Sequence, residues 1–281
     1  MKRQDLKNWI LDFDLKTSKP LVLGILNLTP DSFWDGGKYL ASKNALMRVE
    51  QMIEEGVDIL DIGGESTRPG SIRIDEKTEF ERVIPVVKAI RKEFDVAISI
   101  DTYKPQIMQA ALDEGADMIN DVCALESEAS IEIIKSFEAP VCLMHISGNL
   151  NDIANPKPNT DVIADIIDFF QKKTTDLISQ GLHSKQLIID PGIGFGKTIE
   201  DNLKILKHLD AFTELNYPVL IGTSRKKFIG QILDRDIEQR LSGTMTTQIM
   251  SYLSGCRIFR VHDIRETKDC LTMAKAIVEC E

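Results

Sequence analysis

One local pattern recurs eight times along the 281 residues: a short apolar run ends in a polar residue and leads into a helix-length segment. The polar residues that end the runs are Asn27, Asp61, Asp101, Asn120, His145, Asp190, Ser224 and His262. Intervals between neighbours range from 19 residues (101 to 120) to 45 residues (145 to 190), each long enough for a helical crossover. The pattern therefore predicts parallel strands that alternate with helices.

Eight such units without a break in composition predict a single (β/α)8 TIM barrel with a parallel eight-stranded core, a fold of about 250 residues. We expect one domain over residues 1–281, with a polar leader at residues 1–20. A doubly wound open sheet is the alternative. In a barrel the strand-ending polar residues would meet at the carboxyl end, where active sites of this fold lie. The glycine-rich segments after strands one and two are expected to be mobile loops.

The apolar runs and helical periodicity also predict where the elements lie. Expected strands span residues 21–26, 57–62, 96–100, 117–119, 140–144, 187–190, 218–221 and 257–262. Expected helices span residues 41–55, 75–92, 104–114, 127–137, 161–180, 199–209, 238–254 and 264–278.

Composition narrows the choice of partners. With 44 acidic and 34 basic residues, the formal net charge is −10, so the chain has no general attraction for nucleic acid or an anionic membrane. The five cysteines and four histidines are scattered without metal-binding spacing, which indicates reduced thiols in a cytoplasmic protein and argues against zinc. No run approaches membrane-spanning length, and residues 1–9 do not resemble a signal segment.

The segment at residues 186–197 combines a buried-strand pattern with a carboxylate and three alternating glycines. A phosphate-binding P-loop would need glycine where Pro191 stands, and a dinucleotide fingerprint would need glycine where Lys197 stands. The glycines allow backbone to approach a flat ligand closely. The segment is therefore predicted to be a ligand loop of another kind, unless it is only a tight strand-to-helix turn.

Two chemical groups emerge among the residues expected at the barrel mouth. Asp101, Asn120 and Asp190, with Lys226 as a donor, suit a planar heterocycle that carries several N–H and C=O groups. Arg68, Arg260 and His262, with Asn27, suit an anionic leaving group and an assisting Mg²⁺. We expect the acids on one wall of the cup and the cations on the opposite wall.

Simpler interpretations stay open for each of these groups. Any one aspartate could cap the helix that follows it, and the arginines could pair with neighbouring acids. Two carboxylates could also be a glycosidase pair, although the chain has only two Trp and four Tyr to form sugar platforms.

Eight motifs resemble those of the dihydropteroate synthase family, in the family's order, from Leu21 to Glu279. They are Asn27-Leu-Thr-Pro-Asp-Ser-Phe33 with Asp35-Gly-Gly37, Gly64-Glu-Ser-Thr-Arg-Pro-Gly70, Ser99-Ile-Asp-Thr102, Ile119-Asn-Asp-Val122, Met144-His145 with Gly148, Asp190-Pro-Gly-Ile-Gly-Phe-Gly-Lys197, Ser224-Arg-Lys226 and Arg260-Val-His-Asp263. One departure is Trp34, where the family usually has a small residue.

The resemblance implies folate synthesis: p-aminobenzoate displaces pyrophosphate from 6-hydroxymethyl-7,8-dihydropterin diphosphate, with Mg²⁺ as cofactor. It implies the following roles. The pterin ring would be bound by Asp101, Asn120, Asp190 and Lys226, with Arg260 stacked on it. The pyrophosphate, which carries Mg²⁺, would be held by Asn27, Arg260 and His262, with Asn27 as the metal residue. The p-aminobenzoate, or a sulfonamide, would be bound by Phe33, Thr67, Pro69, Phe195 and Lys226. Asp35 and Arg68 of the two loops complete the expected substrate contacts, and Asp101, Asp190, Lys226, Arg260 and His262 form the expected catalytic set.

The implied chemistry needs no general base, because pterin-stabilised cation formation can precede attack by the neutral aryl amine. Three other functions stay open: methyl transfer to a corrinoid protein, a Schiff-base aldolase that uses Lys226, and a silent pterin-binding protein. The family also suggests a homodimer formed through the last two helices.

Overall fold

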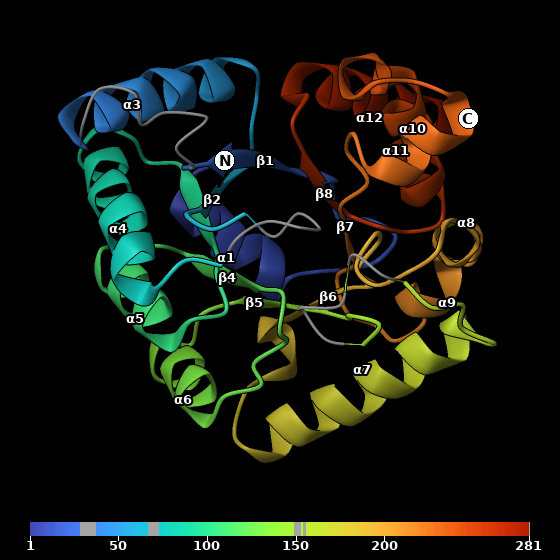
Figure 1. Ribbon diagram of the computed structural model, residues 1–281, viewed down its shortest axis with the longest axis horizontal. Coiled ribbons are helices and arrows are strands. Elements are labelled where there is room, and N and C mark those ends of the chain that lie inside the picture. The colour runs from blue at the N-terminus through green and yellow to red at the C-terminus, as the bar shows by residue number, and fades with distance from the viewer. Residues whose placement is uncertain (29–37, 67–72, 149–152, 154–155, 281) are drawn as a thin grey trace.

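The structure is a computed structural model that describes residues 1–28, 38–66, 73–148, 153 and 156–280. Its strands form one parallel sheet in the order β6-β5-β4-β3-β2-β1-β8-β7, surrounded by helices (Figure 1). The strands are β1 (Leu21–Asn27), β2 (Ile59–Gly63), β3 (Ala97–Asp101), β4 (Met118–Asp121), β5 (Val141–Met144), β6 (Leu187–Asp190), β7 (Leu220–Ile221) and β8 (Ile258–Val261).

The sheet closes on itself between β6 and β7. Ile189 bridges Val219 in parallel, and the Ile189 N–H donates to the Pro218 carbonyl at 3.0 Å. This contact joins the two ends of the strand order, so no open edge is left at that point. The predicted TIM barrel is confirmed, and the doubly wound open sheet is excluded.

The helices follow the strands as expected, with three additions. They are α1 (Arg3–Leu11), α3 (Lys38–Glu54), α4 (Glu76–Glu93), α5 (Pro105–Asp113), α6 (Glu128–Phe137), α7 (Val162–Ser179), α8 (Ile199–Lys207), α9 (Asp210–Thr213), α10 (Lys227–Leu233), α11 (Leu241–Leu253) and α12 (Ile264–Val278). The sequence patterns missed α1, α9 and α10, which are nine residues long or shorter and give little periodicity. The helix expected from residue 238 begins only at Leu241, after a short 3₁₀ turn.

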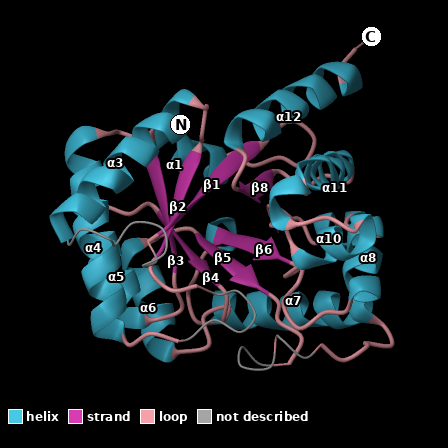
Figure 2. Cartoon of the chain, turned by 45° about the horizontal axis from the view of Figure 1, so that its top comes forward, coloured by secondary structure: helices cyan, strands magenta, loops and turns pink. Residues whose placement is uncertain are grey.

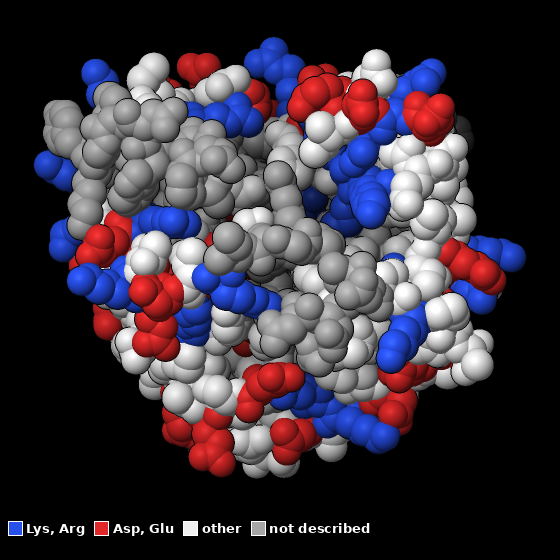
Figure 3. All heavy atoms as spheres, in the orientation of Figure 1, with Lys and Arg blue, Asp and Glu red and all other residues white. Residues whose placement is uncertain are grey.

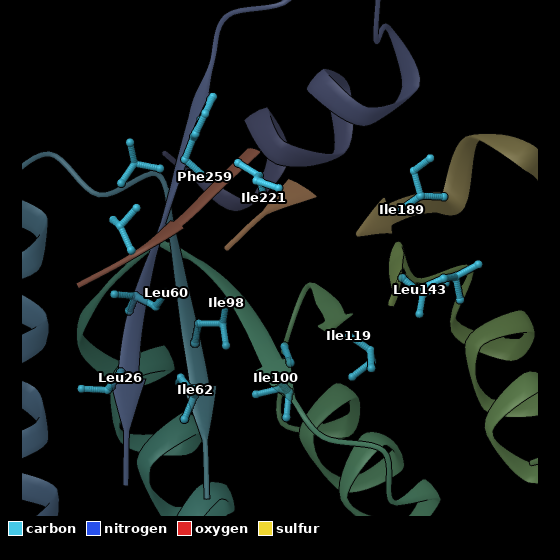
Figure 4. Packing of buried hydrophobic residues seen from close by; sticks show 14 of the residues in the cluster. Leu26, Leu60, Ile62, Ile98, Ile100, Ile119, Leu143, Ile189, Ile221 and Phe259 are labelled. Carbon is cyan, nitrogen blue, oxygen red and sulfur yellow. The ribbon is translucent and has the colours of Figure 1, made fainter. Parts of the chain in front are cut away.

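Side chains alternate between the two faces of each strand, so the barrel has two apolar layers. Outward residues such as Leu60, Ile98 and Phe259 pack beneath the helices (Figure 4). Inward residues such as Ile59 and Ile258 fill the amino end of the barrel. The inward layer at this end is apolar, whereas the polar residues that end the strands gather at the carboxyl end.

Helix α1 covers the amino end of the barrel interior, and in Figure 1 it lies across the middle of the ring. Leu6, Trp9 and Ile10 are buried together with the inward residues of the strands. The Trp9 indole N–H donates to the Lys19 carbonyl at 3.0 Å, which satisfies its polar edge. The segment expected to be only a polar leader therefore contains a helix that contributes three side chains to the core.

We predict that Leu6→Ala lowers the free energy of unfolding by about 3 kcal/mol, because it leaves a cavity among the inward residues. Leu6 is 2% exposed, whereas Leu11 in the same helix is 44% exposed. The matched Leu11→Ala control should change the free energy by less than about 0.5 kcal/mol. Urea-induced unfolding measures both, and equal effects for the two variants would contradict a sealing role for α1.

Candidate active site

A cavity of about 750 Å³ opens at the carboxyl end of the strands. Every expected site residue that the structure describes lines it, namely Asn27, Asp101, Asn120, Asp190, Phe195, Lys226, Arg260 and His262. Lys and Arg side chains gather beside the hollow at the centre of this face (Figure 3). The loops that follow β6 and β7 form its outer part, where Ile199, Lys204 and Gln231 extend it between α8 and α10.

Arg260 lies at the centre of the acidic part of the cavity. Its Nε donates to Asp61 Oδ2 at 2.6 Å, and its Nη2 donates to Asp101 Oδ2 at 2.6 Å. Asn120 Nδ2 lies 3.4 Å from the same Asp61 oxygen. Burial raises the pKa of Asp101 to about 7, although the Arg260 guanidinium opposes the shift. The acids around Arg260 hold the pKa of its guanidinium above the usual value in spite of burial.

This arrangement corrects the expected separation of acids and cations. The sequence predicts Arg260 on a wall opposite the acids, but its guanidinium is hydrogen-bonded between Asp61 and Asp101. For Asp61 the sequence predicts a position at a strand end and no role in the site. The alternation of Ile59, Asp61 and Gly63 along β2 would have placed its side chain inside the barrel, but it would not have named its partner.

Asp190 at the end of β6 and Lys226 in the loop after β7 line the same cavity. Asp190 Oδ1 accepts from the Gly192 N–H at 2.7 Å. Lys226 Nζ donates to the Ile193 carbonyl and lies 4.7 Å from the centre of the Phe195 ring. Burial lowers the pKa of Lys226 to about 8, opposed by the Asp190 charge, and burial also raises the pKa of Asp190. Lys226 is therefore close to the point where a bound ligand decides its charge.

The glycines after β6 are required by the neighbouring loop. A Cβ on Gly192 (φ +70°) would lie 1.9 Å from the His145 carbonyl oxygen, and one on Gly196 (φ +67°) would lie 2.0 Å from that of Ser147. The buried Lys197 ammonium donates to the carbonyls of His145 and Gly192, each at 3.0 Å. The segment at residues 186–197 is thus a cavity wall that is fastened to the loop after β5.

His262 is oriented by Ser224. The Ser224 Oγ lies 2.9 Å from His262 Nδ1 and accepts the His262 backbone N–H at 3.2 Å. Since Oγ accepts that N–H, its own proton can point to Nδ1, which favours the tautomer with the proton on Nε2. Neutral His262 would then offer an N–H donor rather than a basic nitrogen.

Comparison with known proteins bears directly on this site. A family model described as "Pterin binding enzyme" matches residues 23–262. The chain is 42% identical over 263 residues to the dihydropteroate synthase of Haemophilus influenzae, covering 93% of this chain and 95% of that protein. It is 39% identical to the Escherichia coli dihydropteroate synthase, covering 95% of each. The chain belongs to the dihydropteroate synthase family.

Solved structures of dihydropteroate synthases agree with the fold. The Yersinia pestis enzyme in complex with a sulfonamide drug has a TM-score of 0.88 and 37% identity, covering 95% of this chain and 97% of that one. The Xanthomonas albilineans enzyme with 4-aminobenzoic acid has a TM-score of 0.88 and 39% identity, covering 96% of each. The family resemblance and the transferase class expected from the motifs are confirmed, and the Schiff-base, methyl-transfer and silent alternatives are set aside.

Five of the expected substrate contacts lie outside the described residues. Phe33 and Asp35 of the first glycine-rich segment lie outside the described residues, as do Thr67, Arg68 and Pro69 of the second. The same holds for Trp34, the departure from the family pattern. Their roles therefore stay predictions.

The residues around Asn27 fit a cation that is shared with a phosphorylated substrate. The described residues contain no group of three or more His, Cys, Asp or Glu side chains that could hold a metal. A Cβ on Gly63 would lie 3.7 Å from Asn27 Oδ1 and 3.6 Å from Asp101 Oδ2, but Asp101 Oδ2 already accepts from Arg260 Nη2 at 2.6 Å, which leaves Asn27 Oδ1 as the oxygen that could face a cation there. Mg²⁺ prefers oxygen ligands and often takes most of them from phosphates and water, so Asn27 suits it as a protein ligand.

We predict that Arg260→Met lowers the free energy of unfolding by about 3–5 kcal/mol at alkaline pH, because it leaves Asp61 and Asp101 buried without their partner. Without Arg260 the pKa of Asp101 should rise above its present value of about 7. A carboxyl pKa that is higher in the native state makes the native state bind more protons, so the loss of stability should shrink as the pH falls toward about 6.

Arg257→Met, at the residue that precedes β8, is the matched control, since Arg257 Nη1 donates to the backbone carbonyls of Tyr252 and Cys256 at 3.1 and 3.0 Å. Its effect should not vary over that pH range. Urea-induced unfolding at several pH values measures both variants, and a pH-independent effect of Arg260→Met would refute the pairing.

Proposed function

We propose that the cavity condenses 6-hydroxymethyl-7,8-dihydropterin diphosphate with p-aminobenzoate and releases pyrophosphate by a Mg²⁺-assisted dissociative substitution. The observation that carries this mechanism is the position of Arg260, between two buried carboxylates and beside Asn120. A pterin ring bound to these groups would lie against carboxylates that stabilise a cation. The departing diphosphate would lie against the donors Arg260 and His262.

The pterin is assigned to the innermost part of the cavity. Asp61 Oδ1 and Asp101 Oδ1 are buried and have no hydrogen-bond partner, which is costly unless a ligand donates to them. Asn120 and Asp190 supply further polar groups to a flat ring, and Lys226 can donate to its carbonyl or ring nitrogen. The Arg260 guanidinium, held in place through two of its nitrogens, would lie against the ring.

The diphosphate is assigned to Asn27, Arg260 and His262, with Arg68 as a further contact implied by the family. His262 would donate from Nε2, since Ser224 engages Nδ1. Bound Mg²⁺, held by Asn27 and phosphate oxygens, would neutralise charge on the leaving group. An anion is stabilised here, whereas the carboxylates deeper in the cavity stabilise a cation. The bond between the pterin methylene and the diphosphate should therefore break with its electron pair leaving on the diphosphate.

The p-aminobenzoate is assigned to the wall formed by Phe195 and Lys226, with Phe33, Thr67 and Pro69 as contacts implied by the family. The amine attacks as the neutral base and loses its proton afterwards, so the site needs no general base. Because relatives carry 4-aminobenzoic acid or a sulfonamide drug, we propose that sulfonamides compete with p-aminobenzoate in this chain.

The function is tested by mixing purified protein, Mg²⁺, the pterin diphosphate and p-aminobenzoate and measuring released pyrophosphate. We predict turnover that a sulfonamide suppresses at low p-aminobenzoate. Asp190→Asn should reduce kcat/KM at least about 100-fold, because the amide replaces a buried carboxylate that faces the ring. Asp168→Asn, in an exposed ion pair of α7, is the matched control and should be neutral. Near-normal turnover of Asp190→Asn would refute the assignment.

We also propose a homodimer that forms through α11 and α12. These two helices pack side by side on one flank (Figure 2). Their outer surfaces expose Met250 and Leu253 of α11 and Met273 and Ile277 of α12, each more than half exposed. Large apolar side chains gathered on one face indicate a protein contact, and a second copy of the chain is the simplest partner.

We predict that Leu253→Glu combined with Ile277→Glu converts the dimer to a monomer, because the carboxylates would be buried without partners at the interface. Phe80→Glu is the matched control, since Phe80 is 45% exposed on α4. Sedimentation velocity at micromolar concentration measures the mass. A monomeric unmodified chain, or a variant that still dimerises, would contradict the proposal.

We further propose a cytoplasmic location. Cys123, Cys142, Cys256 and Cys270 are free thiols, and Cys142 and Cys256 are completely buried. Free thiols suit a reducing compartment. Among the described residues, none of the helices has the length and apolar character to cross a membrane.

A further inference from the structure

The turn after β4 is built around one residue that does not line the cavity. Asn120 and Val122 line the cavity, whereas Asp121 between them is 1% exposed and points away from it. Its Oδ1 accepts from the Cys123 N–H at 2.8 Å and its Oδ2 accepts from the Leu125 N–H at 2.8 Å. Its carbonyl oxygen accepts from the Ala124 N–H at 3.1 Å. Three consecutive backbone N–H groups thus converge on Asp121.

The backbone of this turn is strained. Ala124 and Leu125 are both in the left-handed region, with φ of +53° and +54°, and neither is a glycine. Such conformations persist only where the surroundings impose them. The Asp121 carboxylate holds Ala124 and Leu125 in this conformation through its hydrogen bonds to the turn backbone. Lys173 Nζ of α7 also supports the turn by donating to the Leu125 carbonyl at 3.0 Å.

The position of Asn120 leaves little tolerance for movement of this turn. Its Nδ2 reaches Asp61 at 3.4 Å, which is near the limit for a hydrogen bond. Its backbone carbonyl accepts from Thr102 at 3.2 Å, and the next two residues lead directly into the strained turn. A shift of a few tenths of an ångström would therefore remove the Asn120 side chain from the group around Arg260.

We propose that Asp121 is a positioning residue for the pterin subsite: by holding the left-handed turn at Ala124 and Leu125, it fixes Asn120 and Val122 against the pterin ring. This role rests on the proposed pterin subsite and deepens it. Asp121 is not catalytic, because it touches no part of the cavity. The p-aminobenzoate wall, formed by Phe195 and Lys226, belongs to other loops and should not depend on it.

Asp121→Asn tests the proposal. An asparagine amide can accept one of the two N–H groups but presents its own N–H₂ to the other. If the turn then keeps the binding conformation about a tenth of the time, the apparent Kd for the pterin diphosphate rises about tenfold. The KM for p-aminobenzoate should change less than about twofold. Calorimetry with the pterin diphosphate and pyrophosphate-release kinetics measure the two quantities.

Ala124→Gly separates positioning from general stability. Glycine adopts the left-handed conformation without the Cβ penalty, so the turn needs less support from Asp121. Alone, Ala124→Gly should change the pterin Kd less than about twofold. Combined with Asp121→Asn, it should recover at least about threefold of the lost pterin affinity, which a loss of unrelated core packing would not allow.

An unchanged pterin Kd in Asp121→Asn overturns the proposal, as does an equal loss for both substrates that Ala124→Gly does not rescue. The unmodified chain in the same assay distinguishes the proposed function from the positioning role. If the unmodified chain turns over and Asp121→Asn has no effect, only the positioning role is refuted. If Asp121→Asn does not fold, Lys173→Met perturbs the same turn from α7. Lys173→Met must then raise the pterin Kd at least about twofold, and an unchanged Kd in this variant overturns the proposal.

Discussion

The pairing of Arg260 with two carboxylates inside the barrel is the interaction on which the site depends. A buried guanidinium or a buried carboxylate alone would be strongly unfavourable, so each group requires the others. The strand order makes the pairing possible, because β8 adjoins β1, and β2 and β3 follow. Arg260 on β8 therefore reaches Asp61 on β2 and Asp101 on β3 across the interior. The pairing therefore depends on the neighbouring strands β8, β1, β2 and β3 lying in this order.

Burial also brings the pKa values of two site residues close to neutral pH. With the amino end sealed by α1 and the inward apolar residues, the polar groups meet water only through the mouth. Desolvation moves the pKa of Asp101 up to about 7 and that of Lys226 down to about 8. Each group lies close to the balance between its charged and neutral forms. A bound ring that donates to Asp101 and accepts from Lys226 would fix the charge of both groups with a small change in free energy.

Apolar runs, helical periodicity and the parity of strand residues made much of this structure predictable from the sequence. All eight strands lie within two residues of their expected positions, and α12 has the expected bounds, because apolar runs and helical periodicity report local structure directly. The pairing of Arg260 with Asp61 was not predictable in this way, since alternation shows which side chains point inward but not which of them meet. Helix α1 was missed because its three core residues lie among polar ones, and α10 because it has seven residues.

The same alternation of inward and outward side chains gives the residue next to a site residue a different role, which is to hold the loop at the strand end. Asn120 faces the cavity, while Asp121 turns outward and holds its own loop. His262 faces the cavity, while Asp263 pairs with Arg225 of the loop after β7 at 2.6 Å. Thr102, next to Asp101, accepts the N–H of Lys104 at 3.2 Å. Because an inward and an outward side chain alternate at each strand end, the outward neighbours can make the cup rigid without entering it. Residues that control substrate binding in this fold are therefore to be sought one position away from those that touch the substrate.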